Sequence, residues 1–306
     1  MLLRDAIRET AAVLASAGIE DARLEAEWLC ETALGLKRPQ LALQAGRTLA
    51  PTEAERIHAW GARRAAGEPL QYVLGETDFY GLTFKVGPGV LIPRPETEKL
   101  VELALEALAK FPLSPGLLAT RNTQHETFAS ATVLDLCTGS GCVALAIAAQ
   151  LATRSTQQET VVCAVDLSPD ALRYARENQT ALGIPGVRFF EGDLYAPLPA
   201  GLRFAVITAN PPYIAPPLYD ALPHEVKGHE PELALRADED GLAVFRRIVE
   251  GARERLLPGG WLFCELSSEH ADPARAILSR HGFTEIGFLP DSFGKPRFAV
   301  GRAPAA

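Results

Sequence analysis

The sequence predicts an α/β protein in which a mostly parallel, doubly wound sheet follows a small all-helical domain. Residues 1–75 space their apolar side chains with a helical period. Beyond residue 131, short apolar strands alternate with helices and glycine turns, which is typical of a parallel sheet covered on both faces. At 306 residues, 47% of them hydrophobic, the chain is long enough for two domains that each bury a core.

The first region, residues 1–75, is expected to be a helical domain. Its apolar stripe includes Leu3 and Leu14, and Thr52 with Glu55 matches a capping box that opens a further helix. The region contains 9 Lys and Arg residues and 10 Asp and Glu residues, so the count predicts no basic face.

The second region, residues 76–95, is expected to be a β-hairpin linker. Apolar residues alternate around Gly81, and prolines and glycines follow them. Arg94 is flanked by prolines and is expected either to contact the substrate or to tie the linker to the next domain. A helix is expected to begin near Thr97.

The third region, residues 96–306, carries the alternating strands and helices, with the last strand expected to be antiparallel. Strands are expected at 132–136, 161–165, 187–190, 204–208, 261–266, 283–288 and 297–301. Residues 113–131 and 153–160 show no sustained period and are expected to be surface insertions. Ligands bind at the carboxyl ends of the strands in such sheets, so the loops that follow the first four strands should converge.

The first of these loops is rich in glycine and opens a helix. It consists of Cys137, Thr138, Gly139, Ser140 and Gly141. Glycines let a ligand lie against bare backbone, and a helix N-terminus presents free N–H groups. The pattern is shared by dinucleotide oxidoreductases and methyltransferases, and glycine also occurs in such turns for packing alone.

The next two strands end in acidic residues. Asp166 can accept hydrogen bonds from both ribose hydroxyls of an adenosine, or it can act only as a carboxylate at a helix start. Because Ser168 already suits the N-cap, the ribose interpretation is favoured. Asp193 can accept from an adenine amino group and Leu194 can pack on the ring, although Asp is common in turns.

The fourth strand ends in Asn210, Pro211, Pro212 and Tyr213, which predicts a rigid corner facing the cofactor cleft. An amide nitrogen is a poor nucleophile because its lone pair is delocalised into the carbonyl group. If the Asn210 side-chain oxygen and the Pro211 carbonyl each accept one N–H, the nitrogen is held with its lone pair toward a methyl donor. Tyr213 is expected to cover the planar group. The corner therefore predicts methyl transfer to a planar nitrogen, chiefly by positioning.

Other polar residues give weaker signals. The five cysteines are scattered without metal-ligand spacing, and His224 and His229 are five residues apart, so no metal is expected. Glu265, at the end of an apolar strand, is expected either to face the cleft or to cap the sheet.

Charge and targeting signals limit the partners. A formal net charge of −8 and an isoelectric point near 5.4 argue against a protein that tracks a phosphate backbone. The N-terminal residues include Asp5 and Glu9, which is unlike a signal or transit peptide, and no apolar run is long enough to span a bilayer. We expect a cytoplasmic monomer that binds neither nucleic acid nor membrane.

These motifs resemble the release factor glutamine methyltransferases of the HemK/PrmC type. The resemblance runs from GEPLQYVLGETDFYGLTFKVGPGVLIPRPETE through DLCTGSGCVALA, AVDLSPDAL, GDL, NPPYI, HEPELAL and GGWLFCEL to DSFGKPRFAV, and it covers nearly the whole chain. It implies a Rossmann-like class I S-adenosylmethionine methyltransferase domain at residues 96–306 and a release-factor-binding helical domain at residues 1–75.

The resemblance also implies a substrate, a cofactor and a role for each site residue. The substrate is the glutamine of a Gly-Gly-Gln motif in peptide chain release factors, methylated on its side-chain amide nitrogen. S-adenosyl-L-methionine is the cofactor and S-adenosyl-L-homocysteine the product. The implied cofactor residues are Cys137, Thr138, Gly139, Ser140, Gly141, Asp166, Asp193, Leu194 and Asn210. The implied glutamine-binding residues are Asn210, Pro211, Pro212 and Tyr213, of which Asn210, Pro211 and Tyr213 are expected to be catalytic.

Three alternatives remain at this point. An adenine-amine methyltransferase acting on DNA or RNA poses the same planar-nitrogen problem, but it needs a basic surface for its nucleic acid. An NAD-dependent oxidoreductase shares the glycine loop and Asp166 but does not account for Asn210. A non-catalytic binding scaffold leaves the intact cofactor positions without a purpose.

Overall fold

The computed structural model describes residues 1–111, 131–154, 161–238 and 240–305. The chain forms two compact units. The helical unit consists of residues 1–77, 86–88 and 223–229, and the sheet unit contains the remaining residues. Within the described ranges, no helix has both the length and the apolar character needed to cross a membrane.

The helical unit is built on five helices from the start of the chain: α1 (Leu3–Ser16), α2 (Ala22–Leu34), α3 (Arg38–Leu43), α4 (Pro51–Ala65) and α5 (Leu70–Leu74). Leu3, Leu14, Leu29 and Ile57 are fully buried between them, as the helical period predicts. The short helix α10 (His224–Lys227) also belongs to this unit, although the sequence places it far from the others.

The buried Arg64 of α4 connects these pieces of the helical unit. Its guanidinium group donates to Glu25 at 2.6 Å and 3.1 Å, and to Glu225 of α10 at 2.8 Å. Charge-assisted bonds of this kind are stronger than neutral ones. The capping box predicted at Thr52 is wrong, because α4 begins at Pro51 and Glu53 accepts from the Ala50 N–H at 2.9 Å.

The hairpin predicted between residues 76 and 95 is formed by β1 (Glu76–Phe79) and β2 (Leu82–Lys85). The buried side chain of Asn178 holds β2 in the sheet unit. Its oxygen accepts from the Lys85 N–H at 2.7 Å, and its amide group donates to the carbonyls of Lys85 and Ser140. Asn178 of the sheet unit therefore links β2 to the glycine loop.

A seven-stranded sheet forms the centre of the sheet unit, in the order β5-β4-β3-β6-β7-β9-β8. The strands are β3 (Ala131–Leu136), β4 (Val162–Asp166), β5 (Val187–Glu191), β6 (Phe204–Ala209), β7 (Leu256–Glu265), β8 (Thr284–Pro290) and β9 (Pro296–Arg302). Pairing is parallel from β5 to β7, and β9 is antiparallel to both of its neighbours. The predicted fold class, including the antiparallel last strand, is confirmed.

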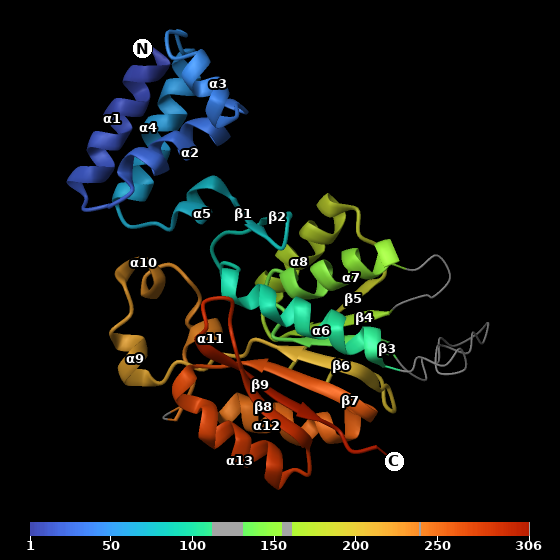
Figure 1. The fold of residues 1–306 in the computed structure, drawn as a ribbon. Coiled ribbons are helices and arrows are strands. Elements are labelled where there is room, and N and C mark those ends of the chain that lie inside the picture. Colours follow the sequence, from blue (N-terminus) through green and yellow to red (C-terminus); the bar gives the residue numbers. More distant parts are fainter. Residues whose placement is uncertain (112–130, 155–160, 239, 306) are drawn as a thin grey trace. The chain divides into compact units, whose positions relative to one another are not determined.

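Helices cover both faces of this sheet (Figure 1). On one face lie α6 (Glu98–Lys110), α7 (Cys142–Arg154) and α8 (Pro169–Leu182), and on the other lie α12 (Ala243–Arg255) and α13 (Ala271–Arg280). Each face buries its own apolar cluster, with Val133 and Val206 in one and Leu134 and Ile207 in the other. Neighbouring residues of a strand point to opposite faces, so these continuous apolar runs fill both clusters.

Two further expectations concern the start of β7 and the two insertions. Strand β7 begins at Leu256, five residues before the expected Trp261, and its pairing with β6 shifts register between Phe204 and Val206. The expected insertions at 113–131 and 153–160 lie outside the described residues apart from their ends.

Candidate active site

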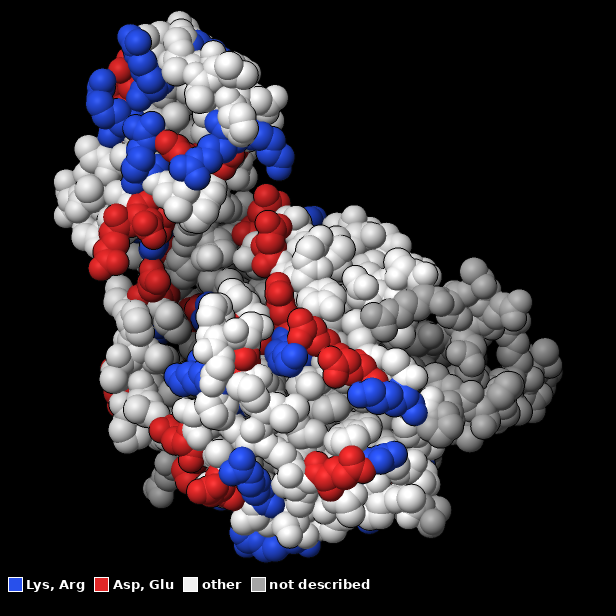
Figure 2. All heavy atoms as spheres, in the orientation of Figure 1, with Lys and Arg blue, Asp and Glu red and all other residues white. Residues whose placement is uncertain are grey.

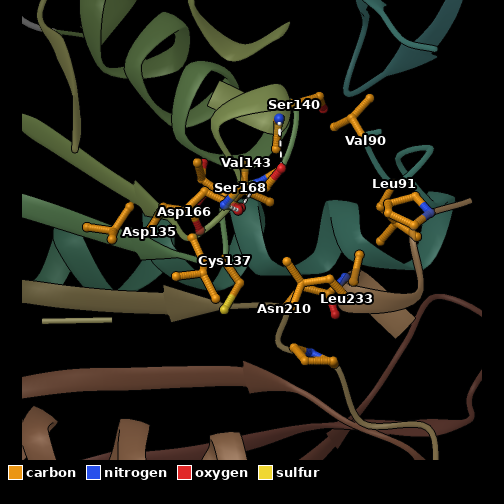
Figure 3. Close-up of a pocket in the computed structure, with 18 of the residues that line it drawn as sticks. Val90, Leu91, Asp135, Cys137, Ser140, Val143, Asp166, Ser168, Asn210 and Leu233 are labelled. Atoms are coloured by element: carbon orange, nitrogen blue, oxygen red, sulfur yellow. Dashed lines mark hydrogen bonds between the residues drawn. The ribbon is translucent and has the colours of Figure 1, made fainter. Parts of the chain in front are cut away.

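A pocket lies at the carboxyl ends of β3, β4, β5 and β6, where the four loops were expected to converge. Its lining from these strand ends and loops includes Asp135, Cys137, Thr138, Gly139, Ser140, Val165, Asp166, Leu167, Ser168, Gly192, Asp193, Leu194, Asn210 and Pro212. In Figure 3, Cys137 lies between Asp166 and Asn210, and Val90, Leu91 and Leu233 approach from another side. The loops therefore meet at one cavity of the sheet unit.

The glycine loop turns the chain sharply from β3 into α7. Gly139 has a φ of 57° and Gly141 a φ of 79°, both in the left-handed region that glycine tolerates best. A Cβ atom at Gly141 would lie 3.1 Å from the Cβ of Ala175, whereas a Cβ at Gly139 would meet nothing nearer than Val90 at 4.0 Å. Gly141 thus allows α8 to pack closely, and Gly139 leaves open space at the pocket wall.

Replacing Gly141 by alanine is expected to lower the free energy of unfolding by about 2 kcal/mol, because it adds contact with Ala175 to the strain of a left-handed residue. Gly139→Ala is the matched control. It has the strain without the close contact, so a smaller loss, about 1 kcal/mol, is expected. Urea denaturation of both variants measures the difference. Equal losses would show that packing against α8 does not explain Gly141.

Asp135 fixes the base of the glycine loop from inside the protein. Its carboxylate accepts from the Thr138 hydroxyl at 2.6 Å and from the Thr208 hydroxyl of β6 at 2.7 Å, and only 1% of the residue is exposed. Burial raises the pKa of Asp135 to about 6, although both hydroxyl donors act in the opposite direction. This carboxylate therefore ties β3, the loop and β6 together.

Asp166 joins the first two loops at the pocket. Its carboxylate accepts from the Gly139 N–H at 2.7 Å and from the Ser168 N–H at 2.9 Å. The Ser168 hydroxyl accepts from the Ala171 N–H at 3.2 Å, which confirms the prediction that Ser168 is the N-cap of α8. Each carboxylate oxygen offers two lone pairs, which leaves Asp166 with acceptor capacity on the pocket side. Burial raises the pKa of Asp166.

The third loop places Asp193 and Leu194 side by side but in different surroundings. Asp193 is exposed and forms an ion pair with Arg247 of α12 at 2.5 Å, while Leu194 is buried. The chain reaches them through Gly192, where a Cβ atom would lie 3.0 Å from the ring of Pro197. Arg247 also lines the pocket, and no sequence signal singled it out.

The fourth loop brings Asn210 and Pro212 into the pocket lining, which does not include Pro211 or Tyr213. Pro211 is buried. Tyr213 is half-buried, packs against the apolar cluster beneath the sheet, and donates its hydroxyl to Glu265 at 3.3 Å. The structure thus brings Asn210 together with the glycine loop and Asp166.

Family comparisons agree with this arrangement. A model described as the PrmC N-terminal domain matches residues 5–75, and a model of the methyltransferase small domain matches residues 116–219. A release factor glutamine methyltransferase of Geobacter sulfurreducens is 41% identical over 98% of this chain and 96% of its own length. This chain belongs to the release factor glutamine methyltransferase family. Another member, from Koribacter versatilis, is 36% identical over 100% of both chains.

Solved structures place the family's fold among the methyltransferases. The catalytic domain of hMettl16, solved with an RNA hairpin, has a TM-score of 0.52 and 15% identity, covering 84% of this chain and 82% of that one. A 16S rRNA methyltransferase of T. thermophilus, solved with AdoMet and guanosine, has a TM-score of 0.50 and 18% identity, covering 74% and 49%. At these identities the likeness concerns the fold alone. The chain is a methyltransferase of the release factor glutamine methyltransferase family with a class I fold.

Several pocket residues of this family member gave no separate sequence signal. Buried Glu230 accepts from the Ile92 N–H at 3.0 Å and from Arg94 at 2.5 Å, and it thereby holds the segment that carries Val90 and Leu91. Of the two roles expected for Arg94, the structure shows the one in which it ties the linker to the next domain, through its pair with Glu230. Arg94 also lines the pocket. The HEPELAL motif, which includes Glu230, was the available signal.

The five cysteines of the chain all lie in the described residues, and none is in a disulfide. Cys30, Cys142, Cys163 and Cys264 are buried, while Cys137 is half-buried at the pocket wall. Burial raises the pKa of the Cys163 thiol to about 11. Among the residues that the structure describes, no cluster of three or more His, Cys, Asp or Glu side chains could hold a metal ion.

Proposed function

We propose that this methyltransferase moves a methyl group from S-adenosyl-L-methionine to the side-chain amide nitrogen of a glutamine. The substrate glutamine is that of the Gly-Gly-Gln motif of peptide chain release factors, and the modification modulates translation termination. One observation carries the proposal: Asn210, at the head of an Asn-Pro-Pro-Tyr corner, lines the same pocket as Gly139 and Asp166. The names of full-length relatives support the release factor as substrate.

The pocket residues fit the adenosyl cofactor. Gly139 leaves open backbone at the wall, and the buried Ser140 hydroxyl has no hydrogen-bond partner among the described residues. In this proposal Asp166 binds the ribose of the cofactor, and Asp193 and Leu194 border its adenine. The rest of the cofactor is bound by Cys137, Thr138, Gly139, Ser140, Gly141 and Asn210. When bound, the cofactor would supply an electrophilic methyl group and leave as S-adenosyl-L-homocysteine, and the methylated nitrogen would release one of its two protons to water.

The acceptor nitrogen is positioned by the corner. In the proposal, the Asn210 side-chain oxygen and the Pro211 carbonyl each accept one N–H of the glutamine amide, and Pro212 and Tyr213 complete the binding surface. Both hydrogen bonds draw electron density toward the nitrogen and fix its lone pair toward the methyl group. Prolines suit this corner because their φ is fixed, so little conformational freedom is lost on binding.

The surroundings of the site support a protein partner. The formal net charge is −8, and acidic side chains separate the basic ones on the described part of the sheet unit that Figure 2 shows. A phosphate-tracking enzyme concentrates Lys and Arg instead. We propose that the first 75 residues contribute to binding the release factor, and that the enzyme works as a cytoplasmic monomer without nucleic-acid or membrane contact.

Radiolabelled S-adenosylmethionine tests the substrate directly. The purified enzyme is incubated with a release factor, with the same factor carrying Gln→Ala in its Gly-Gly-Gln motif, and with DNA and RNA. We expect label on the intact factor alone, because only it presents the amide nitrogen. Label on nucleic acid would transfer the proposal to adenine methylation, and label on the Gln→Ala factor would exclude this glutamine as the acceptor.

A further inference from the structure

A chain of hydrogen bonds runs from Asn210 into the protein, away from the pocket. The Asn210 amide group donates to the Thr97 hydroxyl at 3.3 Å, and Thr97 donates to the Glu265 carboxylate at 2.7 Å. The second Glu265 oxygen accepts from the Tyr213 hydroxyl at 3.3 Å. Thr97 is 3% exposed and Glu265 is 1% exposed. We call the three residues Asn210, Thr97 and Glu265 the relay.

The direction of the relay follows from the chemistry of its last member. An ionised carboxylate only accepts hydrogen bonds, so Thr97 must give its single proton to Glu265. The Thr97 oxygen is then an acceptor toward Asn210, and the side of Asn210 that faces it must be the NH2 group. The carbonyl oxygen of the Asn210 amide is therefore turned away from Thr97 and is free to accept.

We propose that Thr97 and Glu265 are positioning residues that hold the Asn210 amide in the one orientation able to accept the substrate N–H. The inference rests on the proposed function and deepens it, since it assigns a task to two residues behind the acceptor corner. An Asn210 side chain with the opposite orientation presents NH2 to the substrate NH2. Two donors then oppose each other, and the glutamine nitrogen is not held.

The relay comes from three separate parts of the chain. Thr97 lies in the turn η1 (Pro95–Thr97) just before α6, Asn210 follows β6, and Glu265 ends β7. Thr97 forms no cap with its own helix, so its hydroxyl is reserved for the relay. Such preorganisation places a donor or acceptor before the substrate binds, which is how polar groups contribute most to catalysis.

The protonation of Glu265 decides whether the relay keeps its direction. The pKa of Glu265 is raised to about 7, chiefly by burial and also by Glu96, while Thr97, Arg297 and Tyr213 act in the opposite direction. Arg297 is itself paired with Asp291 at 3.0 Å and Glu96 at 3.6 Å. Below this pKa the carboxylic acid can donate to Thr97, which frees the Thr97 proton for the Asn210 oxygen and reverses the amide.

Deleting one hydroxyl tests the relay. Thr97→Val is expected to lower kcat for release-factor methylation about 10- to 100-fold, with little change in KM, because the acceptor amide loses its fixed orientation. Thr97→Ser keeps the hydroxyl and is expected to restore most of kcat. Thr83→Val, which removes the hydroxyl donated to Asp78 in the hairpin, is the matched control and should leave kcat unchanged.

The pH profile provides a second readout that does not depend on the valine variant folding. Wild-type kcat is expected to fall as the pH drops through about 7, and Glu265→Gln is expected to lack that inflection. The folded-state pKa is raised above that of an unfolded Glu, so wild type should also lose stability relative to Glu265→Gln as pH rises from about 4.5 to about 7.

The possible outcomes separate the relay from the proposed function. If wild type methylates the release factor while Thr97→Val keeps its kcat, or Glu265→Gln keeps the inflection near pH 7, the relay is wrong and the substrate stands. If Thr97→Ser is as slow as Thr97→Val, the hydroxyl is not what matters and the relay is again wrong. If wild type leaves every release factor unlabelled although it binds S-adenosylhomocysteine, both proposals are overturned.

Discussion

Replacing Asn210 by alanine is expected to lower kcat for release-factor methylation by about 100- to 1,000-fold, the range seen when a preorganised polar group is removed from a reaction site. Alanine removes the acceptor that faces the pocket and also ends the hydrogen bond to Thr97. The affinity for S-adenosylhomocysteine should change far less, because Asp166 and the glycine loop remain. Single-turnover methylation and calorimetric binding measure the two effects separately.

Tyr213→Phe is the informative comparison for Asn210→Ala at the same corner. It keeps the aromatic ring and removes only the hydroxyl bond to Glu265, which at 3.3 Å is the longer of the two that this carboxylate accepts from side chains. A loss of only about tenfold or less is expected. If kcat of Asn210→Ala instead stays within about fivefold of the wild-type value, far less than the loss expected for a preorganised group, Asn210 has no part in the mechanism.

Replacing Asp166 by alanine is expected to weaken cofactor binding about 100-fold. Two charge-assisted bonds to ribose hydroxyls contribute about 1.5–3 kcal/mol each, and the lower end of their sum, about 3 kcal/mol, corresponds to roughly two orders of magnitude in Kd. The same change releases the Gly139 N–H and the Ser168 N–H, so the shape of the loop is loosened as well. Calorimetric titration with S-adenosylhomocysteine measures the change.

The matched control for Asp166 is Asp170→Ala on the first turn of α8. Asp170 is exposed and lies at the same helix start. It therefore tests the alternative in which Asp166 acts only through its negative charge near the helix N-terminus. We expect Asp170→Ala to bind S-adenosylhomocysteine like wild type. Equal weakening in both variants would favour that simpler role and contradict the assignment of Asp166 to the ribose.

The sheet and one wall of the pocket were predictable because each rests on a local pattern. Short apolar strands followed by glycine or acidic residues mark strand ends, and parallel strands bring those ends to one edge of the sheet. Helix α8, for example, begins at Pro169 and ends at Leu182 as the sequence suggests, since Ser168 caps it and Gly183 follows with a φ of 63°.

The opposite wall was not predictable from such patterns. Val90, Leu91 and Leu233 reach the pocket because Glu230 pairs with Arg94 and the Ile92 N–H across 136 and 138 positions of sequence, and no periodicity reports a pairing of that kind. The capping box failed for a smaller reason. Glu53 accepts from the Ala50 N–H, so the N-cap of α4 is Ala50, two residues earlier than Thr52 suggested.

The sequence could not decide whether Glu265 faces the cleft or caps the sheet. The alternation of side chains along a strand does not show which other segments pack against the strand's end. The structure shows that Thr97, predicted only as the neighbourhood of a helix start, supplies its partner. Both residues lie in segments that carry the family resemblance, PRPETE and GGWLFCEL, but neither segment indicates what its side chain contacts. The hydrogen bond between them forms only because the fold brings η1 and β7 together, so the relay could not be predicted from the sequence.

The place of β9 in the sheet has a consequence for the way the chain is made. During synthesis β8 emerges before β9. Within the described part of the chain β8 pairs with β9 alone, and β9 also pairs with the outer edge of β7. Until β9 inserts, the outer edge of β7 and both edges of β8 are open to other chains. Glu265 has Phe298 of β9 as its neighbour, so the nascent enzyme completes its acceptor corner only with this late insertion.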